Sequence, residues 1–314
     1  MSQVSKKALV LLNMGGARNK NELKMFLTNM FNDKNILTVK SNFLRSMIAK
    51  FIVTSRLNSA WENYEEIGGF SPLNPLTEKL VDKLNKSLQE AETFQVMRYT
   101  PPFANECIKQ LKDKEIKDVI LLPLYPQYST TTTKSSLEDF EQAAKNEFNL
   151  TIIEPFYENE IYNQAIINSI TKEVSNARSE DFNLIFSAHG LPQKIVDAGD
   201  PYEKQVNDHV EILSKLLEKR GVKFKSISLA YQSKVGPMKW LEPALDKELE
   251  KYTDDNVLIY PIAFIIDNSE TDFELSIEYK EEADKVGIKD YRVCKCVNDD
   301  DIFIEAIKDI TKLN

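Results

Sequence analysis

The stretch FNLIFSAHGLPQKIVDAGDPY, residues 182–202, begins with a short apolar run that shows no alternation of polar and apolar residues. Such a run is typical of a strand buried on both faces of a parallel sheet. Gly190 and Pro192 end the run, which places His189 at the carboxyl end of the predicted strand. Ligands of open α/β sheets bind at that edge. A neutral imidazole there can accept a proton or bind a transition metal, although a histidine that only caps a turn would give the same pattern.

The composition is that of an acidic protein with room for two domains. The chain has 314 residues and a formal net charge of −9, and this length is enough for two ordinary hydrophobic cores. The negative charge argues against a nucleic-acid partner, which would require a basic face. No run approaches about 18 consecutive apolar residues, so the sequence predicts no transmembrane helix. We therefore expect a cytoplasmic protein.

The three cysteines, Cys107, Cys294 and Cys296, fit a reducing compartment and give no disulfide framework. Cys294 and Cys296 are separated by one residue, which is not the usual C-x-x-C spacing. Three thiols also cannot supply the four cysteine ligands of an ordinary iron–sulfur cluster. We expect no iron–sulfur cluster and no bound prosthetic group.

Strands and helices are predicted to alternate along the chain. The predicted strands are 7–14, 94–99, 119–124, 151–155, 182–189, 226–231 and 257–262. The predicted helices are 104–114, one from about 136, 161–177, 202–220, one from Trp240 to about 252, and one over about 301–313. Thr77 is a candidate N-cap for a further helix that runs to about residue 92.

Two segments from different halves of the chain share one order of features. VILLPLYPQYSTT (119–131) and VLIYPIAFIIDNSETDF (257–273) are each a buried strand with a proline near its end, followed by a polar loop and an acidic helix. We predict two similar α/β domains, residues 1–150 and 151–314, with a cleft between their strand ends. A single continuous sheet would contradict this repeat.

The segment 36–61 differs in character from the rest of the chain. Apolar pairs recur every four residues at 43/44, 47/48 and 51/52, which predicts a helix. No acidic residue lies between Asp33 and Glu62, whereas several lysines and arginines do. A basic, apolar helix in an acidic protein is a candidate for contact with a membrane surface or an anionic apolar ligand. The alternative is a helix that faces the core and has a solvated basic side.

Glu270, Glu274 and Glu278 are spaced i, i+4, i+8 and share roughly one face of the helix predicted after strand 257–262. Such an acidic row is either a solvated face or a path for cations. If the strands before His189 and Glu270 are neighbours, their side chains meet at one edge of the sheet. One imidazole and one carboxylate would leave open positions on a divalent metal, which suits a site that passes metal on.

These residues belong to motifs that resemble the ferrochelatase family. In the second half the motifs are FSAHGLP (186–192), GDPY (199–202), YQSKVGPMKW (231–240), PIAF (261–264), Glu270-Thr271 and IEY (277–279). In the first half they are LNMGG (12–16), IGG (67–69), Arg98-Tyr99 and YPQYS (125–129). The motifs span nearly the whole chain in the family's order.

The resemblance implies a lyase that inserts Fe2+, as a substrate, into protoporphyrin or coproporphyrin in the last step of haem synthesis. It implies two Rossmann-like domains, each a parallel sheet flanked by helices, with the porphyrin cleft between them. His189 and Glu270 match the family's catalytic and metal positions, and Glu274 and Glu278 match its acidic helix. The positions that match the porphyrin pocket are Leu37, Arg56, Arg98, Tyr99, Tyr125, Trp240 and Phe264. The segment 36–61 resembles the lip of that pocket, a candidate for peripheral contact with the inner face of the membrane.

One position departs from the family's pattern. Members often have a histidine directly after the aspartate that corresponds to Asp267, whereas this chain has Asn268. An amide cannot accept and release protons near neutral pH. Proton transfer would then depend on His189, Glu270 and water.

Two other functions fit parts of the same pattern. A chelatase could insert cobalt or nickel into another tetrapyrrole, and metal selectivity would separate it from an iron chelatase. A non-enzymatic haem or porphyrin carrier would use the two domains and the apolar lip. The acidic row beside a lone histidine argues against a carrier, because a carrier needs no cation path.

Overall fold

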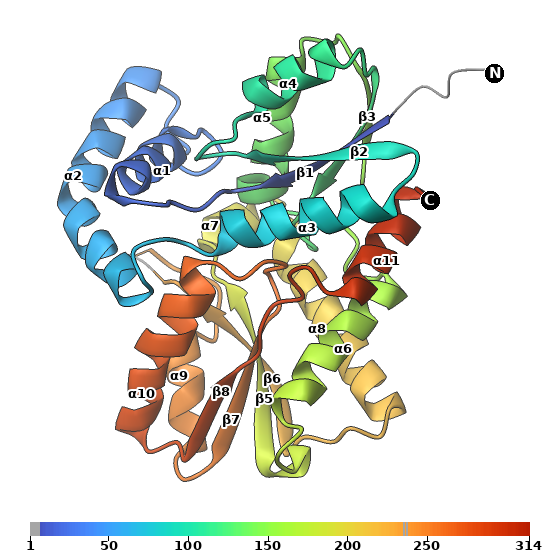
Figure 1. Ribbon diagram of the computed structural model, residues 1–314. Helices are drawn as coiled ribbons and strands as arrows, with labels where there is room; N and C mark the ends of the chain where they lie inside the picture. The colour runs from blue at the N-terminus through green and yellow to red at the C-terminus, as the bar shows by residue number, and fades with distance from the viewer. Residues whose placement is uncertain (1–6, 235, 237) are drawn as a thin grey trace. The chain divides into compact units, whose positions relative to one another are not determined.

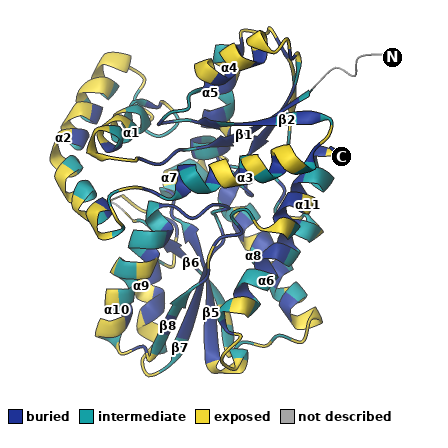
Figure 2. Ribbon diagram, in the orientation of Figure 1, coloured by how far each residue is buried: buried dark blue, intermediate teal, exposed yellow. Residues whose placement is uncertain are grey.

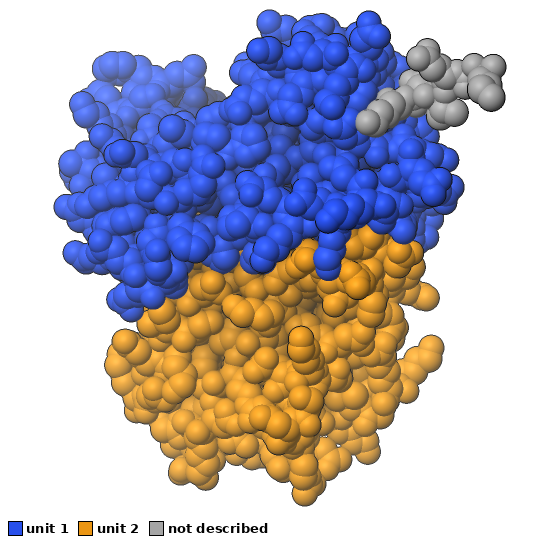
Figure 3. Space-filling model, viewed as in Figure 1, with its two compact units in different colours: residues 1–125, 129–154, 307–314 blue, residues 126–128, 155–306 orange. Residues whose placement is uncertain are grey.

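In the computed structural model, which describes residues 7–234, 236 and 238–314, the chain divides into two compact units (Figure 3). Unit 1 takes the chain up to residue 125, together with residues 129–154 and 307–314. Unit 2 takes residues 126–128 and 155–306. Val235 and Pro237 of the YQSKVGPMKW motif lie outside the described residues.

Unit 1 is built on a parallel sheet with the strand order β2-β1-β3-β4. The strands are β1 Lys7–Asn13, β2 Ala91–Met97, β3 Asp118–Pro123 and β4 Asn149–Ile152. The helices are α1 Lys20–Asn32, α2 Asn42–Glu66, α3 Leu73–Ser87, α4 Ala104–Asp113, the π-helix η1 Thr130–Lys134 and α5 Ser135–Ala144. The core packs Val10 and Leu121 of the central strands against Leu111 of α4 and Phe140 of α5. The apolar runs in β1 and β3 are thus buried, as their lack of alternation predicts.

Unit 2 is built on a second parallel sheet, with the strand order β6-β5-β7-β8 (Figure 1). The strands are β5 Phe182–His189, β6 Ser226–Gln232, β7 Asn256–Pro261 and β8 Asp290–Val293. The helical elements are α6 Glu160–Glu173, η2 Ser179–Asp181, α7 Gln193–Asp197, α8 Tyr202–Lys219, α9 Leu245–Leu249, η3 Glu250–Tyr252, the π-helix η4 Glu270–Glu278 and α10 Tyr279–Val286. The last helix, α11 Asp301–Thr311, begins in unit 2, and its residues from 307 on belong to unit 1. Ile185 and Ile259 of the two central strands pack with Leu249 and Leu275 in the core of unit 2.

The two sheets have the same topology, which confirms the predicted repeat and the fold class. In each unit the first strand lies between the second and the third, and the fourth pairs with the third. The described residues contain no single continuous sheet, since each set of four strands pairs only within itself. The strands that precede His189 and Glu270 are direct neighbours, because β5 pairs with β7. The cleft between the domains stays a prediction.

The predicted start of the helix after residue 70 was wrong. The helix α3 begins at Leu73, and Thr77 lies inside it, where its hydroxyl donates to the Leu73 carbonyl at 2.7 Å. The residue before the helix is Pro72, whose ring fixes φ near the helical value. The Ser71 hydroxyl accepts a weak hydrogen bond of 3.4 Å from the Leu73 amide. A serine and a proline therefore start this helix one turn earlier than the threonine would.

Three other differences concern short elements of unit 2. The helix predicted after Trp240 forms only over α9 and η3, because Pro243 precedes it and disfavours a helical residue before itself. The helix α7 and the strand β8 were not predicted. Both are five residues or fewer, which is too short for a periodic pattern to show in the sequence.

The helix α2 is exposed along much of its length, as the yellow colour in Figure 2 shows, and its exposed residues include large apolar ones. Phe43 and Phe51 are each 76% exposed, and Leu44 and Met47 are about half exposed. Ala49 and Val53 are buried instead. Phe43, Leu44, Met47 and Phe51 of the predicted stripe therefore do not face the core, although α2 buries another face. Within the part of the chain that the structure describes, no helix is both long enough and apolar enough to cross a membrane.

Candidate active site

The strand β5 presents His189 at its carboxyl end, and two hydrogen bonds define the geometry there. The Nδ1 atom of His189 lies 2.7 Å from the Gly190 carbonyl oxygen. A carbonyl can only accept, so Nδ1 carries the proton in the neutral ring and Nε2 presents a lone pair. The Tyr202 hydroxyl donates to the His189 carbonyl at 3.0 Å. The ring is thus held in the tautomer that can accept a proton at Nε2.

Glu270 reaches the same edge from the neighbouring strand β7. Its Oε2 atom lies 3.7 Å from Nε2 of His189. This oxygen is buried, and among the described residues it has no hydrogen-bond partner. A buried carboxylate oxygen without a donor is costly, which makes it a favourable position for a cation. The structure therefore brings together the two residues that the sequence singled out.

Glu274 lies one turn further along η4 and is held by two donors. Gln232 Nε2 donates to Glu274 Oε2 at 3.1 Å, and the Ser233 hydroxyl donates to the same oxygen at 2.6 Å. The hydroxyl of the fully buried Ser187 donates to Gln232 Oε1 at 2.8 Å and so turns the amide group toward Glu274. Burial and the neighbouring Glu270 carboxylate raise the pKa of Glu274 to about 7.

Glu278 is the exposed end of the acidic row. Partial burial of the carboxyl and the charge of Glu274 raise the pKa of Glu278. The three glutamates thus run from a half-buried position beside His189 to the surface. Groups of three or more His, Cys, Asp or Glu side chains arranged to hold a metal ion do not occur among residues 7–234, 236 and 238–314. The metal role of the row stays a prediction.

The sequence missed Gln232 and Ser233 as individual residues, although both lie in the YQSKVGPMKW motif. Gln232 is the last residue of β6, which pairs directly with β5, and Ser233 follows it. Their position at the end of a predicted strand could have identified them, because ligand-binding side chains gather at the carboxyl ends of neighbouring parallel strands.

In unit 1 the predicted pocket residues Arg98 and Tyr99 converge on one carboxylate, Asp33. The Tyr99 hydroxyl donates to Asp33 Oδ2 at 2.9 Å, and the Arg98 guanidinium lies 3.3 Å from the same oxygen. The Ser135 hydroxyl also donates to Asp33. A second carboxylate, Asp139, lies 3.2 Å from Arg98. Arg98 is thus already paired twice, and Asp33 is a buried residue that no motif or spacing in the sequence singled out.

Tyr125, Leu37 and Arg56 are the remaining predicted pocket residues of unit 1. The Tyr125 hydroxyl lies 3.1 Å from the Ser136 hydroxyl, and burial raises the pKa of Tyr125 above its ordinary value. Leu37 is half-buried in the turn after α1, where its amide donates to the Asp33 carbonyl. Arg56 is exposed on α2. Each of these side chains remains a predicted porphyrin contact.

Trp240 and Phe264 are the predicted pocket residues of unit 2. Trp240 pairs with Pro192 through an isolated antiparallel bridge, so it lies beside the segment that follows His189. A Cβ atom at Gly190 would come within 2.8 Å of the Gln232 carbonyl and 3.3 Å of the Trp240 ring. The glycine of the S-A-H-G motif is therefore required for this close approach. Phe264 is half-buried in the loop after β7.

Asn268, the position that departs from the family's pattern, hydrogen-bonds the backbone at the start of η4. It is 4% exposed, and its Oδ1 atom accepts a hydrogen bond of 2.8 Å from the Glu270 amide. The backbone N–H of Asn268 donates to the Thr271 hydroxyl at 2.9 Å. Asn268 therefore caps the start of η4, and both ends of its side-chain amide are bonded to the backbone, to the Glu270 amide and to the Ile266 carbonyl.

Comparison with known families gives a match over almost the whole chain. A family model described as Ferrochelatase matches residues 6–314. The chain is 52% identical over 311 residues to the ferrochelatase of Sulfurimonas denitrificans, with 98% of each chain covered. It is 53% identical over 306 residues to the ferrochelatase of Wolinella succinogenes, with 96% of each chain covered.

Solved structures with a similar fold are chelatases of much lower identity. SirB from Bacillus subtilis with Fe3+ aligns with a TM-score of 0.59 at 11% identity, over 98% of this chain and 94% of that chain. The sirohydrochlorin chelatase SirB from Bacillus subtilis subspecies spizizenii, in complex with cobalt, aligns with a TM-score of 0.58 at 8% identity, over the same shares. At these identities the likeness shows the fold alone.

Proposed function

The chain belongs to the ferrochelatase family, whose reaction is the insertion of Fe2+ into a porphyrin in haem synthesis, and we propose that His189 and Glu270 carry this reaction here. The observation behind the proposal is the 3.7 Å approach of His189 Nε2 and Glu270 Oε2 at the carboxyl ends of β5 and β7. It places one proton acceptor and one anionic oxygen at the edge of the sheet where such folds bind ligands.

The reaction removes two protons and adds one dication. Two pyrrole N–H protons leave the porphyrin, the ferrous ion sheds its water, and the product carries no net charge at its centre. The macrocycle must also bend so that the pyrrole nitrogen lone pairs become accessible. A ferrochelatase therefore needs a base, an anionic ligand for the incoming metal, and walls that hold the ring.

His189 acts as the base. Its Nε2 lone pair accepts a pyrrole proton, while Nδ1 keeps its own proton and donates it in the hydrogen bond to the Gly190 carbonyl oxygen. The imidazolium that forms is stabilised by the Glu270 carboxylate beside it. The proton then leaves to water or to Glu270, which restores the neutral ring for the second pyrrole.

Glu270 supplies the anionic oxygen that meets the metal. Its buried Oε2 has no other donor among the described residues, so it gains most from a cation. Glu274 and Glu278 extend this negative charge toward the surface and draw cations inward. A carboxylate and an imidazole leave most coordination positions of Fe2+ open, which suits transfer to the porphyrin nitrogens.

The aromatic residues Tyr99, Tyr125, Trp240 and Phe264 contact the porphyrin ring in this proposal. Flat apolar side chains suit a flat macrocycle and can hold it in a bent form. Arg56 and other exposed bases of α2 are better partners for the propionates than Arg98, because Arg98 is already paired with Asp33 and Asp139.

The exposed face of α2 is a membrane-contact surface in this proposal. Phe43, Leu44, Met47 and Phe51 are all about half exposed or more, and Lys40, Lys50 and Arg56 are exposed along the same segment. Apolar side chains with bases beside them favour the surface of an anionic bilayer. The porphyrin substrate is apolar and anionic as well, so the same face could guide it from a bilayer.

The first test is the anaerobic loss of porphyrin fluorescence when Fe2+ is added, for the wild type and His189→Ala side by side. We expect many turnovers with the wild type and a rate at least about 100-fold lower with the variant, because a general base contributes about 10²–10⁴-fold. Circular dichroism and thermal melting of both proteins check that the variant is folded. Protoporphyrin and coproporphyrin are assayed in parallel, each also with Co2+ and Ni2+.

Each outcome assigns the function differently. Porphyrin binding without turnover in the wild type would contradict the enzyme and favour a carrier. Faster turnover with Co2+ or Ni2+ than with Fe2+ would contradict the choice of metal. Full activity of His189→Ala would keep the chelatase but move the base to another group, and an unchanged rate in Glu270→Gln would contradict the metal role of Glu270.

A further inference from the structure

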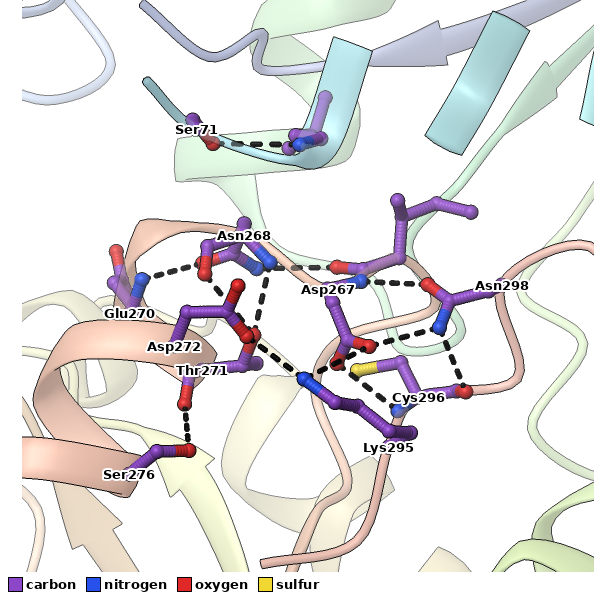
Figure 4. A network of polar contacts seen from close by, with 12 residues as sticks. Ser71, Asp267, Asn268, Glu270, Thr271, Asp272, Ser276, Lys295, Cys296 and Asn298 are labelled. Atoms are coloured by element: carbon purple, nitrogen blue, oxygen red, sulfur yellow. Dashed lines mark hydrogen bonds and ion pairs between the residues drawn. The ribbon is translucent and has the colours of Figure 1, made fainter. Parts of the chain in front are cut away.

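Residues 265–268, the loop that leads from β7 to Glu270, are held by one residue from a distant part of the chain, Asn298 (Figure 4). The Asn298 amide donates to the Ile265 carbonyl at 2.9 Å. The Asp267 amide donates to Asn298 Oδ1 at 2.8 Å. Asn298 Nδ2 donates to Asp267 Oδ2 at 2.8 Å. One residue therefore satisfies backbone and side-chain groups of the loop together.

The carboxylate of Asp267 is the centre of this arrangement, and it faces away from solvent. It is 3% exposed. Besides Asn298, the Cys296 amide donates to its Oδ1 atom at 3.1 Å, and the Lys295 ammonium lies 3.8 Å from Oδ2. A buried carboxylate that accepts from several donors resists displacement, because moving it would leave those donors unpaired. Asp267 is thus a fixed internal anchor.

Lys295 extends the anchor to the first turn of η4. Its ammonium lies 2.9 Å from Asp272 Oδ1 and so bridges Asp267 and Asp272. The Lys295 carbonyl accepts a hydrogen bond of 2.6 Å from the Ser169 hydroxyl. Both ends of the turn that carries Glu270 are therefore tied to the segment 295–298.

The anchor formed by Asp267 and Asn298 determines where the helix η4, and with it Glu270, begins. Directly after Asp267, Asn268 caps the helix by accepting from the Glu270 amide at 2.8 Å, as Figure 4 shows. The Asp272 amide donates to the Asn268 carbonyl at 3.0 Å. A shift of Asp267 would therefore move Asn268 and change the 3.7 Å separation between Glu270 and His189.

Asn298 has a backbone conformation suited to this double contact. Its φ of +50° lies in the left-handed region, which asparagine tolerates better than most residues. There its N–H and its side-chain amide can face the same loop. Glycine also tolerates this conformation, so Asn298→Gly removes the side chain without adding backbone strain.

We propose that Asn298 is a positioning residue for Glu270, acting through the reciprocal hydrogen bonds with Asp267. The proposal rests on the proposed role of Glu270 in the reaction. Asn298 touches neither substrate nor metal. It sets the distance between the two groups that do.

The test is the chelatase rate of Asn298→Gly compared with the wild type and with Asn183→Ala. Loss of a residue that orients a reacting group typically costs about 10–100-fold in activity. We expect a fall of that size in kcat at saturating porphyrin and metal, with little change in the Kd for porphyrin measured by fluorescence. Asn183 is a matched control, since it is 2% exposed and bonds Ser226, Asp255 and Asn256 near the amino end of β5, away from His189. The variant Asn183→Ala should lower the melting temperature but leave kcat within about twofold of the wild-type value.

A second comparison separates positioning from stability. If Asn298 acts through Glu270, adding Asn298→Gly to Glu270→Gln should slow the enzyme little further, because residues that act on one another are not additive. Additive losses in the double variant would overturn the proposal. Equal kcat for Asn298→Gly and the wild type, in a preparation whose wild type turns over, would overturn it too.

An exchange variant tests the reciprocal pair directly. Asn298→Asp alone places two carboxylates against each other and should lose activity. Combining it with Asp267→Asn restores one amide and one carboxylate, and we expect at least a fivefold recovery of kcat, which is about 1 kcal/mol of coupling. No recovery would overturn the role of the pair. An inactive wild type would instead contradict the proposed function, so the two failures are distinguishable.

Discussion

Single hydrogen bonds decide what the side chains at the edge of the β5 strand can do. His189 could carry its proton on either nitrogen, and the Gly190 carbonyl selects Nδ1. Gln232 could present either its oxygen or its nitrogen to Glu274, and the accepting carboxylate oxygen of Glu274 selects the nitrogen, while the Ser187 hydroxyl donates to the Gln232 oxygen. In both cases a neighbour with only one hydrogen-bonding role orients a group that has two.

The Gln232 contact predicts the effect of replacing it by leucine. Gln232→Leu removes a donor from Glu274 and the acceptor of the Ser187 hydroxyl, both inside the protein. Leaving buried polar groups without partners costs about 1–3 kcal/mol each. We expect the free energy of unfolding to fall by about that amount, measured by urea denaturation, together with a lower chelatase rate.

Ser187→Ala is the matched control for this change. It removes the orienting hydroxyl and leaves Gln232 and Ser233 to hold Glu274, so its loss of activity should be smaller than that of Gln232→Leu. A larger loss for Ser187→Ala would show that the amide does not act through this chain of contacts.

At the scale of the element, α2 is unusual because its most apolar face is its most exposed one. Phe43 and Phe51 face solvent, whereas Ala49 and Val53 face the protein. Both faces follow a helical spacing, so periodicity alone predicts the helix but cannot say which face is buried. The basic residues along the stripe favoured an interaction surface, and the exposure agrees with that interpretation.

Replacements on the two faces of α2 should separate binding from stability. Phe51→Ser should leave the melting temperature nearly unchanged, since exposed substitutions alter stability by about 0.5 kcal/mol or less. It should weaken co-sedimentation with vesicles that contain anionic lipid. Val53→Ala, at a position 4% exposed, should do the reverse and lower the melting temperature through a cavity. Equal sedimentation of Phe51→Ser and the wild type would contradict the membrane-contact surface.

The helix η4 shows where sequence reasoning reached its limit. The spacing of Glu270, Glu274 and Glu278 predicted a helix with one acidic face, and the structure has them on one helix. It is a π-helix, in which the Tyr279 amide donates to the Glu274 carbonyl five residues earlier. Propensity and periodicity describe helices of 3.6 residues per turn. They could not predict the wider turn, nor the anchor by Asn298 from 28 residues beyond Glu270.

At the scale of the whole molecule, two units of one topology carry different chemistry at their strand ends. In unit 2 the ends of β5 and β7 lead to an imidazole and a carboxylate, and in unit 1 the end of β2 leads to Arg98 and Tyr99. The similar proline-containing strands at 119–124 and 257–262 made this repeat visible in the sequence. The convergence on Asp33 was not visible, because it joins residues 65 and 102 positions apart.

The second histidine, His209, predicts how the whole fold responds to acid. It is fully buried, and burial lowers its pKa to about 3. Gln127 Nε2 lies 2.8 Å from Nδ1 and must be the donor there, while Nε2 donates to Asn163 Oδ1 at 2.9 Å. Protonation of the ring would place two donors against each other at Nδ1.

The sign of the pH dependence follows from this depressed pKa. In the unfolded chain His209 has a pKa of about 6.5. Between that value and about 3 the unfolded state binds one more proton, so the free energy of unfolding falls as pH drops, by about 1.4 kcal/mol per pH unit. His209→Gln should be less stable at pH 7 but show a shallower fall below pH 6.5. Urea midpoints across pH 5–8 measure the difference, and parallel curves would contradict the assignment.

Residues 126–128 belong to unit 2 and residues 307–314 belong to unit 1, and this division limits the order in which the protein can fold during synthesis. Gln127 lies between two stretches of unit 1 in the sequence but belongs to unit 2, where it hydrogen-bonds His209. At the other end of the chain, the Asn314 carbonyl accepts a hydrogen bond of 2.8 Å from the Gln89 amide in unit 1. Neither unit is one continuous piece of chain. Unit 1 therefore cannot complete its contacts on the ribosome until residue 314 has emerged. A nascent chain that stalls near residue 150 should remain sensitive to protease, even though β1, β2 and β3 are already translated and only β4 is incomplete.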